Sequence, residues 1–500
     1  MAEKEAAINT HPNETPDPQS PSPRVLTEQP PSEQDPNLVT WNGPEDPGYP
    51  RNWPSGKKWA TIIPMSLFTL LTSMSSAIMA PALDSIQQDL HFSSSTMGVI
   101  SLSVYLLGVA IVPLFTAPLS EVFGRMIVLQ VTDMFFIIFN TLCGIAKTPN
   151  QLIGFRFLAG LGGAGANTMG AGLTTDLFEP DKRGSALSLY LLAPSIGMTV
   201  SPIAGGFLVQ YTTWPWCFYL VSLVAGAVQI FGLPFFRETC APVLLQRRRK
   251  RLQKTTGNLN LYTHHDSVSL PHLLRLSLIR PIKLLATQPV VQVWSVYCAY
   301  IYGILYLLIS SFPNVWTGIY GESVSIGSLN YISLFLGMTF ASQVGMRLAN
   351  RSYRKLCSQH GGRGLPEFRL PALMIGAVII PIGLLWYGWS ARPNVHWIMP
   401  NIGAAIYGAG VLHEIQCIVG YIMDTYPKYA ASAVAAVMCI RSLLSFALPL
   451  AAPRLYGNLG LGWGNTLLAL IAVVVGIPAP ILLKRYGVAL RRRSPYARDD

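Results

Sequence analysis

Ala117-Pro-Leu-Ser-Glu-Val-Phe-Gly-Arg125 is a short charged segment between two long apolar runs, residues 97–116 and 126–146. Each run is long enough to cross a bilayer, which takes about 20 apolar residues. The segment between them has no room for a domain, so the two runs are expected to form an antiparallel helical hairpin. Gly124 allows a tight turn of the backbone, and Arg125 marks the cytoplasmic end of the hairpin. The stretch therefore predicts a membrane protein with short charged turns.

The composition agrees with this prediction. The 500 residues are 51% hydrophobic and only 12% charged, which argues against an ordinary soluble enzyme. The net charge of +12 is spread between apolar blocks and over the chain ends, so a nucleic-acid partner is not expected. The seven Cys have neither paired nor metal-ligand spacing, and no nucleophile or metal cluster is evident. We therefore expect no metal, no cofactor and no enzymatic activity.

Apolar runs of membrane-spanning length predict an all-α protein with twelve transmembrane helices in two six-helix halves. The expected spans are residues 60–82, 97–116, 126–146, 151–173, 185–209, 217–236, 288–312, 325–346, 370–390, 398–423, 430–452 and 464–483. The halves then cover residues 57–236 and 288–485, joined by a basic linker over 237–287. The Pro- and Glu-rich tail 1–56 is expected to be disordered, and residues 486–500 form a second tail.

The distribution of Lys and Arg predicts the orientation. With both ends of the chain inside, the outer loops carry only Lys147, Arg392 and Arg454. Such asymmetry places both tails and the linker in the cytoplasm. The basic run 247–251 then falls inside as well, where it serves as a topology determinant that contacts anionic lipid, in preference to a nuclear or RNA-binding signal.

The opening segment resembles the signature Gly-Pro-Leu-Ser-Glu-x-x-Gly-Arg of drug:proton antiporters in the major facilitator superfamily, with Ala117 in place of the first Gly. Arg237-Glu-Thr-Cys-Ala-Pro-Val-Leu-Leu245 and Tyr429-Ala-Ala-Ser-Ala433 are similar to patterns of fungal members. The resemblance covers about residues 45 to 485. It implies the major facilitator fold, in which two halves rock about a central site.

The stretch Asp176-Leu-Phe-Glu-Pro-Asp-Lys-Arg-Gly184 resembles the family's Asp and Arg-Gly pair after helix four. Together with the opening segment, this resemblance implies a charge cluster of Glu121, Arg125, Asp176 and Arg183, next to Gly124, that holds the cytoplasmic side shut. The alternative is a set of solvated loop charges, each contributing little.

Two further stretches combine small residues with a family resemblance. Arg156 lies within an apolar run, where a charge is costly and usually faces the bundle interior. The resemblance implies a part in proton coupling, and the alternative is snorkelling to the outer interface. In the next span, Gly197 and Gly205 recur at helical spacing and predict a flat face for a partner helix. Pro202 is expected to bend this span, and the run to Gly206 resembles an antiporter signature.

A carboxylate in span 398–423 is a candidate for proton coupling that rests on no family motif. Steps of three and four residues place Tyr407 and Glu414 on one face with several small residues, beside His413. A carboxylate at this depth is expected to face the cavity and to exchange a proton. The alternative is that His413 or Arg441 holds Glu414 in a structural role. Asp133 in span 126–146 is the next candidate.

Aromatic residues in span 288–312 are candidates for a substrate pocket. Tyr302 and Tyr306 belong to a stripe that suits flat or cationic ligands, although such a stripe also serves plain packing. We expect a monomeric multi-pass protein, in the plasma membrane, that exports a small organic compound in exchange for protons. The alternatives are proton-coupled uptake of a nutrient or polyamine, and a membrane receptor that transports nothing.

Overall fold

The computed structural model describes residues 37–497, except residues 44, 264–269 and 362–363. Over this part the chain is helical, with one isolated β-bridge between Leu38 and Tyr262. Within the same residues, nine helical stretches are long and apolar enough to cross a membrane, and the last of them, Ala430–Arg492, contains two of the predicted spans. Each of the twelve predicted spans corresponds to a helix, so the prediction of an all-α membrane protein is confirmed.

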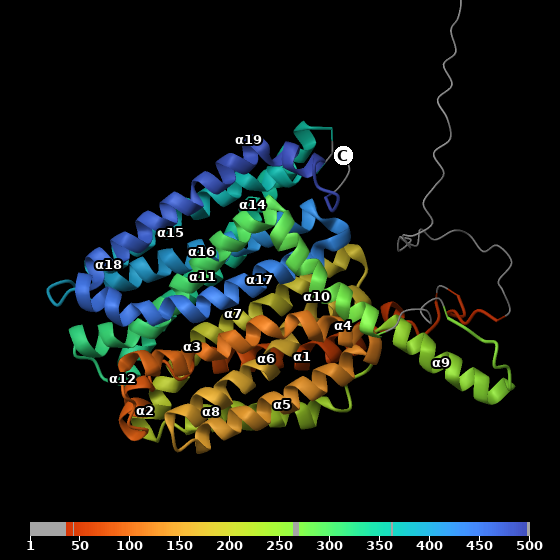
Figure 1. Ribbon diagram of the computed structural model, residues 1–500, viewed down its shortest axis with the longest axis horizontal. Helices are drawn as coiled ribbons and strands as arrows, with labels where there is room; N and C mark the ends of the chain where they lie inside the picture. Colours follow the sequence, from red (N-terminus) through yellow and green to blue (C-terminus); the bar gives the residue numbers. More distant parts are fainter. Residues whose placement is uncertain (1–36, 44, 264–269, 362–363, 498–500) are drawn as a thin grey trace, which may run out of the picture.

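The helices form two bundles that lie side by side (Figure 1). The first bundle comprises α1 (Ser55–Ala77), α2 (Leu83–Asp89), α3 (Ser95–Ile111), α4 (Pro113–Phe123), α5 (Arg125–Ile145), α6 (Pro149–Leu177), α7 (Pro180–Tyr211) and α8 (Trp216–Gly232). The second comprises α11 (Pro289–Asn314), η2 (Val315–Ile319), α12 (Val324–Leu329), α13 (Tyr331–Phe340), η3 (Ala341–Gly345), α14 (Met346–Gln359), η4 (Pro366–Arg369), α15 (Leu370–Ser390), α16 (Ile398–Thr425), η5 (Pro427–Tyr429), α17 (Ala430–Ala447), η6 (Leu448–Ala451), α18 (Ala452–Gly476) and α19 (Pro478–Arg492).

The opening segment of the sequence differs from the expected loop. Residues 117–123 continue the second membrane crossing as α4, and the turn before α5 is the single residue Gly124. Its φ of 102° lies in the region that L side chains rarely adopt, so the glycine is what allows the chain to reverse here. The prediction of a tight turn at Gly124 is confirmed, whereas the prediction that the whole segment is a loop is wrong.

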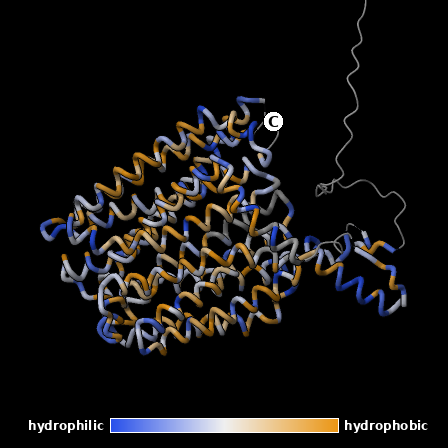
Figure 2. Tube along the Cα trace, viewed as in Figure 1, coloured by the Kyte–Doolittle hydropathy of each residue, from blue (hydrophilic) through white to orange (hydrophobic). Residues whose placement is uncertain are grey.

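The segment between the halves contains two helices, α9 (Ala241–Thr256) and α10 (Leu270–Thr287). The polar helix α9 projects away from one end of the bundle, the end at which the C-terminus also lies (Figures 1 and 2). Residues 37–54, within the tail expected to be disordered, are held against α9: Asp46 forms an ion pair with Arg248 at 2.8 Å. Short η1 (Pro50–Asn52) then leads into α1. Residues 1–36 lie outside the described part.

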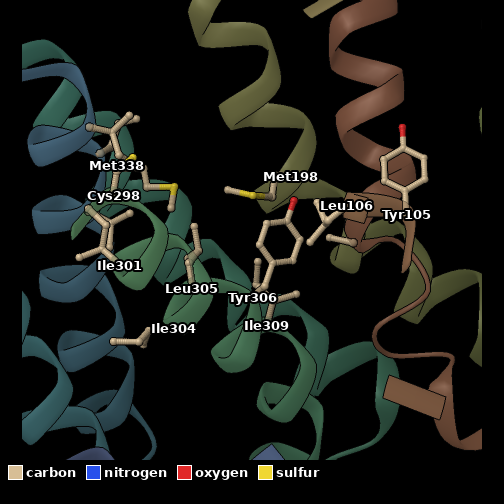
Figure 3. Packing of buried hydrophobic residues seen from close by; sticks show 14 of the residues in the cluster. Tyr105, Leu106, Met198, Cys298, Ile301, Ile304, Leu305, Tyr306, Ile309 and Met338 are labelled. Atoms are coloured by element: carbon tan, nitrogen blue, oxygen red, sulfur yellow. The ribbon is translucent and has the colours of Figure 1, made fainter. Parts of the chain in front are cut away.

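The two halves meet mainly where α3 packs on α17 and where α7 packs on α12 and α13. The linker helix α10 packs on α4 of the first half and on α17 of the second. Apolar side chains fill much of this contact: Figure 3 shows Tyr306 of α11 pointing toward Met198 of α7 and Leu106 of α3. The outward surfaces of the helices carry exposed Ile, Leu, Val and Phe (Figure 2), as expected where a protein faces lipid. We call the end with α9 and α10 the linker end.

Candidate functional site

The turn at Gly124 is closed by a carboxylate from a distant part of the chain. Glu238, only 7% exposed, accepts hydrogen bonds from the backbone N–H groups of Arg125 at 3.0 Å and Met126 at 3.4 Å. These are the first two N–H groups of α5, which lack partners inside the helix, and the positive end of the helix dipole favours a negative group there. A Cβ on Gly124 would approach a Glu238 carboxylate oxygen to 2.1 Å, so the glycine also makes room for the cap.

Arg125 and Asp176 form an ion pair beside this cap. Nε of Arg125 donates to Asp176, and Nη2 donates to the second carboxylate oxygen at 3.4 Å. Both side chains are largely buried, at 15% and 18% exposure. The hydroxyl of Thr239, the residue after the cap, donates to Asp176 at 3.3 Å. The pair therefore ties the start of α5 to the end of α6 and to the chain that leaves α8.

We call Arg125, Asp176, Glu238 and Thr239 the N-half cluster. Of the four charged residues that the sequence predicted to cluster here, Arg125 and Asp176 lie together as expected. The side chains of the other two, Glu121 and Arg183, lie outside the described residues. The contacts of the N-half cluster given above join α5 and α6 of the first half to the start of the linker. At this end, α10 of the linker packs on α4 of the first half and on α17 of the second.

The second half contains a counterpart in the same positions relative to its helices. Arg369, the last residue before α15, donates to Asp424 near the end of α16 at 2.6 Å. The Arg369 guanidinium also stacks on Tyr353 of α14, 4.8 Å from the ring centre. Close by, Arg491 of α19 forms an ion pair with Glu367 at 3.1 Å. We call Glu367, Arg369, Asp424 and Arg491 the C-half cluster.

Arg156 is fully buried inside the first half, which excludes snorkelling to the interface. Its guanidinium donates to three backbone carbonyls, those of Ser75 at 2.7 Å, Leu102 at 3.1 Å and Ser101 at 3.3 Å. It also lies 4.8 Å from the ring centre of Tyr105. Arg156 thus joins α6 to α1 and α3, in a setting that keeps the positive charge solvated by protein dipoles.

The small-residue face of α7 packs as predicted, and its partner is α1. A Cβ on Gly197 would lie 2.3 Å from the Leu70 carbonyl oxygen, and one on Gly205 would lie 2.0 Å from that of Ile78. Gly206 instead faces the other half, where a Cβ would lie 2.0 Å from the hydroxyl of Ser328. Helix α7 runs unbroken from Pro180 to Tyr211 through Pro202. This face therefore brings α7 close to α1, next to a contact between the halves.

Glu414 points into the second half, contrary to the expectation that it faces the cavity. One carboxylate oxygen accepts from the Tyr297 hydroxyl at 3.2 Å, and the other has no partner within the described residues. A Cβ on Gly376 of α15 would lie 2.5 Å from Glu414 Cγ, so the small residues of this face serve close packing of α15 on α16. The ring Nε2 of His413 lies 3.0 Å from the Ala372 carbonyl oxygen, and neither His413 nor Arg441 contacts the carboxylate.

Asp133 is the second buried carboxylate. It is fully buried in α5, and neither of its oxygens has a hydrogen-bond partner in the described part of the chain. An ionised carboxylate without a partner is costly at this depth. Asp133 therefore stays a candidate for reversible protonation, as the sequence predicted.

Polar side chains of three helices gather where the halves meet. The Tyr306 hydroxyl lies 3.0 Å from the Ser76 hydroxyl of α1, which joins the halves directly. One turn away on α11, the Arg441 guanidinium of α17 stacks on the Tyr302 ring, 4.1 Å from the ring centre. Tyr407 does not belong to this group, because its hydroxyl donates to the Ile301 carbonyl at 2.9 Å inside the second half.

A cavity of 310 Å³ lies between the halves at the end opposite the linker end. Its walls come from the turn after α1, α2 and the start of α3 on one side, and from α11, η2 and α18 on the other. Polar groups such as Asp84, Gln87, Ser311 and Tyr456 line it together with apolar side chains. The protein is thus hollow between its halves at this end.

Sequence reasoning missed Glu238, Thr239 and the whole C-half cluster. Glu238 and Thr239 belong to the stretch 237–245, which was quoted above as similar to a fungal pattern. That pattern indicated the family, but it did not indicate which residues Glu238 and Thr239 contact. Arg369 and Asp424 follow no recognised motif, and only their places at the start and end of α15 and α16, mirroring Arg125 and Asp176, would have indicated them.

Comparison with known proteins extends these observations. The family model of the Major Facilitator Superfamily matches residues 65–449. The chain is 43% identical to the efflux pump vrtL of Penicillium aethiopicum over 93% of its own length and 92% of that protein. It is 41% identical to the efflux pump radE of Floropilus chiversii, over 92% and 86% of the two chains. A structure of the xylose transporter XylE from E. coli, in a partially occluded inward open conformation, superposes with a TM-score of 0.63 at 15% identity, over 86% of this chain and 98% of that one.

Proposed function

Because the chain belongs to the major facilitator superfamily, we propose that it exports small organic compounds in exchange for protons, by rocking its two halves about a site between them. The observation that carries this proposal is the similarity, above 40% identity and over more than nine tenths of the chain, to proteins named efflux pumps. The arrangement of charged and aromatic groups supports each part of it.

The orientation follows from charge. We propose that the linker end is cytoplasmic, so that both tails and the linker 237–287 are inside and the halves are residues 57–236 and 288–485. The excess of Lys and Arg at this end supports it. A small tag inserted at Gly257, an exposed turn after α9, is expected to be inaccessible from outside intact cells in the plasma membrane. Labelling of that tag from outside would overturn the two-halves arrangement.

We further propose that the N-half cluster biases the exchange between inward-open and outward-open states. It holds α5, α6 and the chain after α8 together at the linker end, close to where α4 contacts α10 of the linker. We propose that the conformational change moves the linker against α5 and α6, which strains the contacts of Glu238 and Thr239 with the ion pair. Its strength therefore enters the free-energy difference between the two states.

Proton coupling is proposed for Glu414, with Asp133 as the second candidate. Arg156 is added because the family resemblance implies it, and His413 because it precedes Glu414 in α16. Glu414 and Asp133 each have at least one buried carboxylate oxygen without a partner among the described residues, so protonation removes a costly charge. Glu414→Gln keeps the size and removes the titration. Export by this variant is expected to lose its dependence on external pH. Unchanged pH dependence at normal expression would exclude Glu414, and the same test on Asp133→Asn would follow.

The alternatives are less well supported. Uptake of a polyamine needs negative groups where the halves meet, and the charge found next to Tyr302 is the cation Arg441. A receptor that transports nothing needs a folded domain outside the membrane, and the helices of the linker are α9 and α10 alone among the described residues of this segment.

Growth of a pump-deficient yeast that expresses the chain, tested over a panel of azoles, fungal toxins and polyamines, is the direct test of export. Resistance to one or more compounds, with lower cellular accumulation, is the expected result. Increased sensitivity with higher accumulation would favour uptake. No change for any compound, in cells that carry the protein at the surface, would contradict transport of these classes.

A further inference from the structure

Arg441 is a cation within a membrane-spanning helix that has no carboxylate partner among the residues the structure describes. Arg441 is the twelfth of the 18 residues of α17, so it is far from both ends of the helix. Over the residues that the structure describes it forms no ion pair, and its Nε has no hydrogen-bond partner. Among the described residues, the one defined contact of its guanidinium is with the Tyr302 ring. A charge at this depth is costly and is retained where it acts on a substrate or an ion.

The position of Arg441 is next to the place where the halves meet. Tyr302, on which it stacks, is one turn from Tyr306, whose hydroxyl reaches Ser76 of the other half. Helix α17 also packs on α3 of the other half. Tyr306 in turn points toward Met198 and Leu106 (Figure 3). Arg441 therefore lies at the edge of an aromatic and apolar region that bridges the two halves.

Neither buried carboxylate neutralises this cation. Glu414 accepts its hydrogen bond from Tyr297, on the side of α16 that packs against α15 and α11. Asp133 belongs to α5, which packs on α4, α6 and α8 of the first half. The guanidinium thus keeps donors for an acceptor that is not part of the protein.

We propose that Arg441 binds an acidic group of the exported compound, a carboxylate or an ionised phenol attached to an aromatic ring. The planar guanidinium matches a carboxylate with two parallel hydrogen bonds, and Tyr302 and Tyr306 pack on the ring that bears it. The inference rests on the proposed function as an exporter and specifies its substrate class: weak aromatic acids, not cations.

The test compares fluorescent aromatic acids with the amide and the amine of the same ring system, in pump-deficient yeast that expresses the full chain. The variants are Arg441→Gln, Arg441→Lys and, as a matched control, Arg454→Gln, which removes one exposed Arg charge from α18. We expect export of the acids over their amides and amines. Arg441→Gln should lower acid export about tenfold, the loss of one charge-assisted contact. Arg441→Lys should keep part of it, and Arg454→Gln should leave it unchanged.

Export confined to amides or amines would overturn the inference while leaving the proposed function intact. Equal export of acids by the wild type and by Arg441→Gln, at equal surface expression, would overturn it as well. Export of none of the compounds would contradict the proposed function itself for aromatic compounds, and with it the inference.

Discussion

The N-half and C-half clusters place an Arg at the start of one helix against an Asp at the end of the next, yet their surroundings differ. Arg125 and Asp176 are 15% and 18% exposed, whereas Arg369 and Asp424 are 21% and 29% exposed. The additional carboxylate of the first cluster, Glu238, caps α5. That of the second, Glu367, pairs instead with Arg491 of α19. The two halves thus share one Arg–Asp geometry. In the first half the ion pair is less exposed to solvent and lies beside a carboxylate that caps α5, and in the second half it is more exposed.

This difference predicts an order of effects. Breaking a buried ion pair by removing one partner costs more than breaking an exposed one, because the remaining charge cannot be solvated by water. Substitutions in the N-half cluster are therefore expected to change transport more than matched substitutions in the C-half cluster.

The largest effect is expected from Asp176→Asn or Arg125→Ala. Either change leaves one charge of a largely buried pair, at a cost of about 2–3 kcal/mol. We expect protein that is folded and present in the membrane, with export slowed about tenfold or more because the equilibrium between the two states shifts. Initial export rates, normalised to surface expression, measure this. Wild-type rates in both variants would reduce the cluster to solvated loop charges.

Gly124→Ala is expected to have the next largest effect. The backbone φ of 102° is unfavourable for alanine, and its Cβ would meet Glu238 at 2.1 Å. The strain amounts to about 1–3 kcal/mol. We expect lower thermal stability of the purified protein in a fluorescence melting assay, with Gly257→Ala as the control, since that glycine also has positive φ but no atom near its Cβ position. An equal loss in both variants would mean that the backbone alone matters and that the contact with Glu238 does not.

Asp424→Asn is expected to have a smaller effect than Asp176→Asn, about 1 kcal/mol, because its ion pair is more exposed. Arg369 also keeps its contact with Tyr353 after the change. Export should fall no more than about fivefold. A loss as large as that of Asp176→Asn would show that exposure does not separate the two clusters.

The smallest effect concerns the ion pair of Asp46 with Arg248, which joins the segment before α1 to the linker helix α9. The backbone N–H groups of Asn42 and Gly48, and then Arg248, lower the pKa of Asp46 to about 2 from its usual 3.8. A lowered pKa means that the contact stabilises above pH 3.8 and that this stability is lost as the pH falls through about 2. Cleavage of residues 37–54 by pepsin should therefore increase as the pH falls from 3.8 to about 2. In Arg248→Gln this increase should begin at a higher pH. Cleavage that is independent of pH in this range would contradict a stabilising role of the Asp46–Arg248 ion pair.

The sequence predicted the family and the fold well, because membrane spans and the signature around Gly124 depend on local residue types. The match of the family model, and the helices found over all twelve predicted spans, confirm both. The packing of Gly197 and Gly205 on another helix was predicted for the same reason. Small residues at helical spacing admit a close neighbour, wherever that neighbour is in the sequence.

Apart from the ion pair of Arg125 with Asp176, the contacts that join distant segments were not predicted. The same rule of small residues misled the interpretation of Glu414, since a face of small and polar residues suits both a cavity and close packing on α15. Glu238 is more than 100 residues from the helix it caps. The C-half cluster keeps the geometry of its counterpart without the signature, so no motif pointed to it. Such contacts depend on how helices from distant parts of the sequence pack together, and a local pattern of residue types does not encode them.

The central claim is that the N-half cluster holds the linker end more firmly than the C-half cluster, and hydrogen exchange tests it without a known substrate. Amide exchange is measured on the purified wild type, Asp176→Asn and Asp424→Asn. We predict a large increase at the start of α5 and around Glu238 in Asp176→Asn, and a smaller one at the start of α15 in Asp424→Asn. Equal increases in the two variants, or a larger one in Asp424→Asn, would contradict the account.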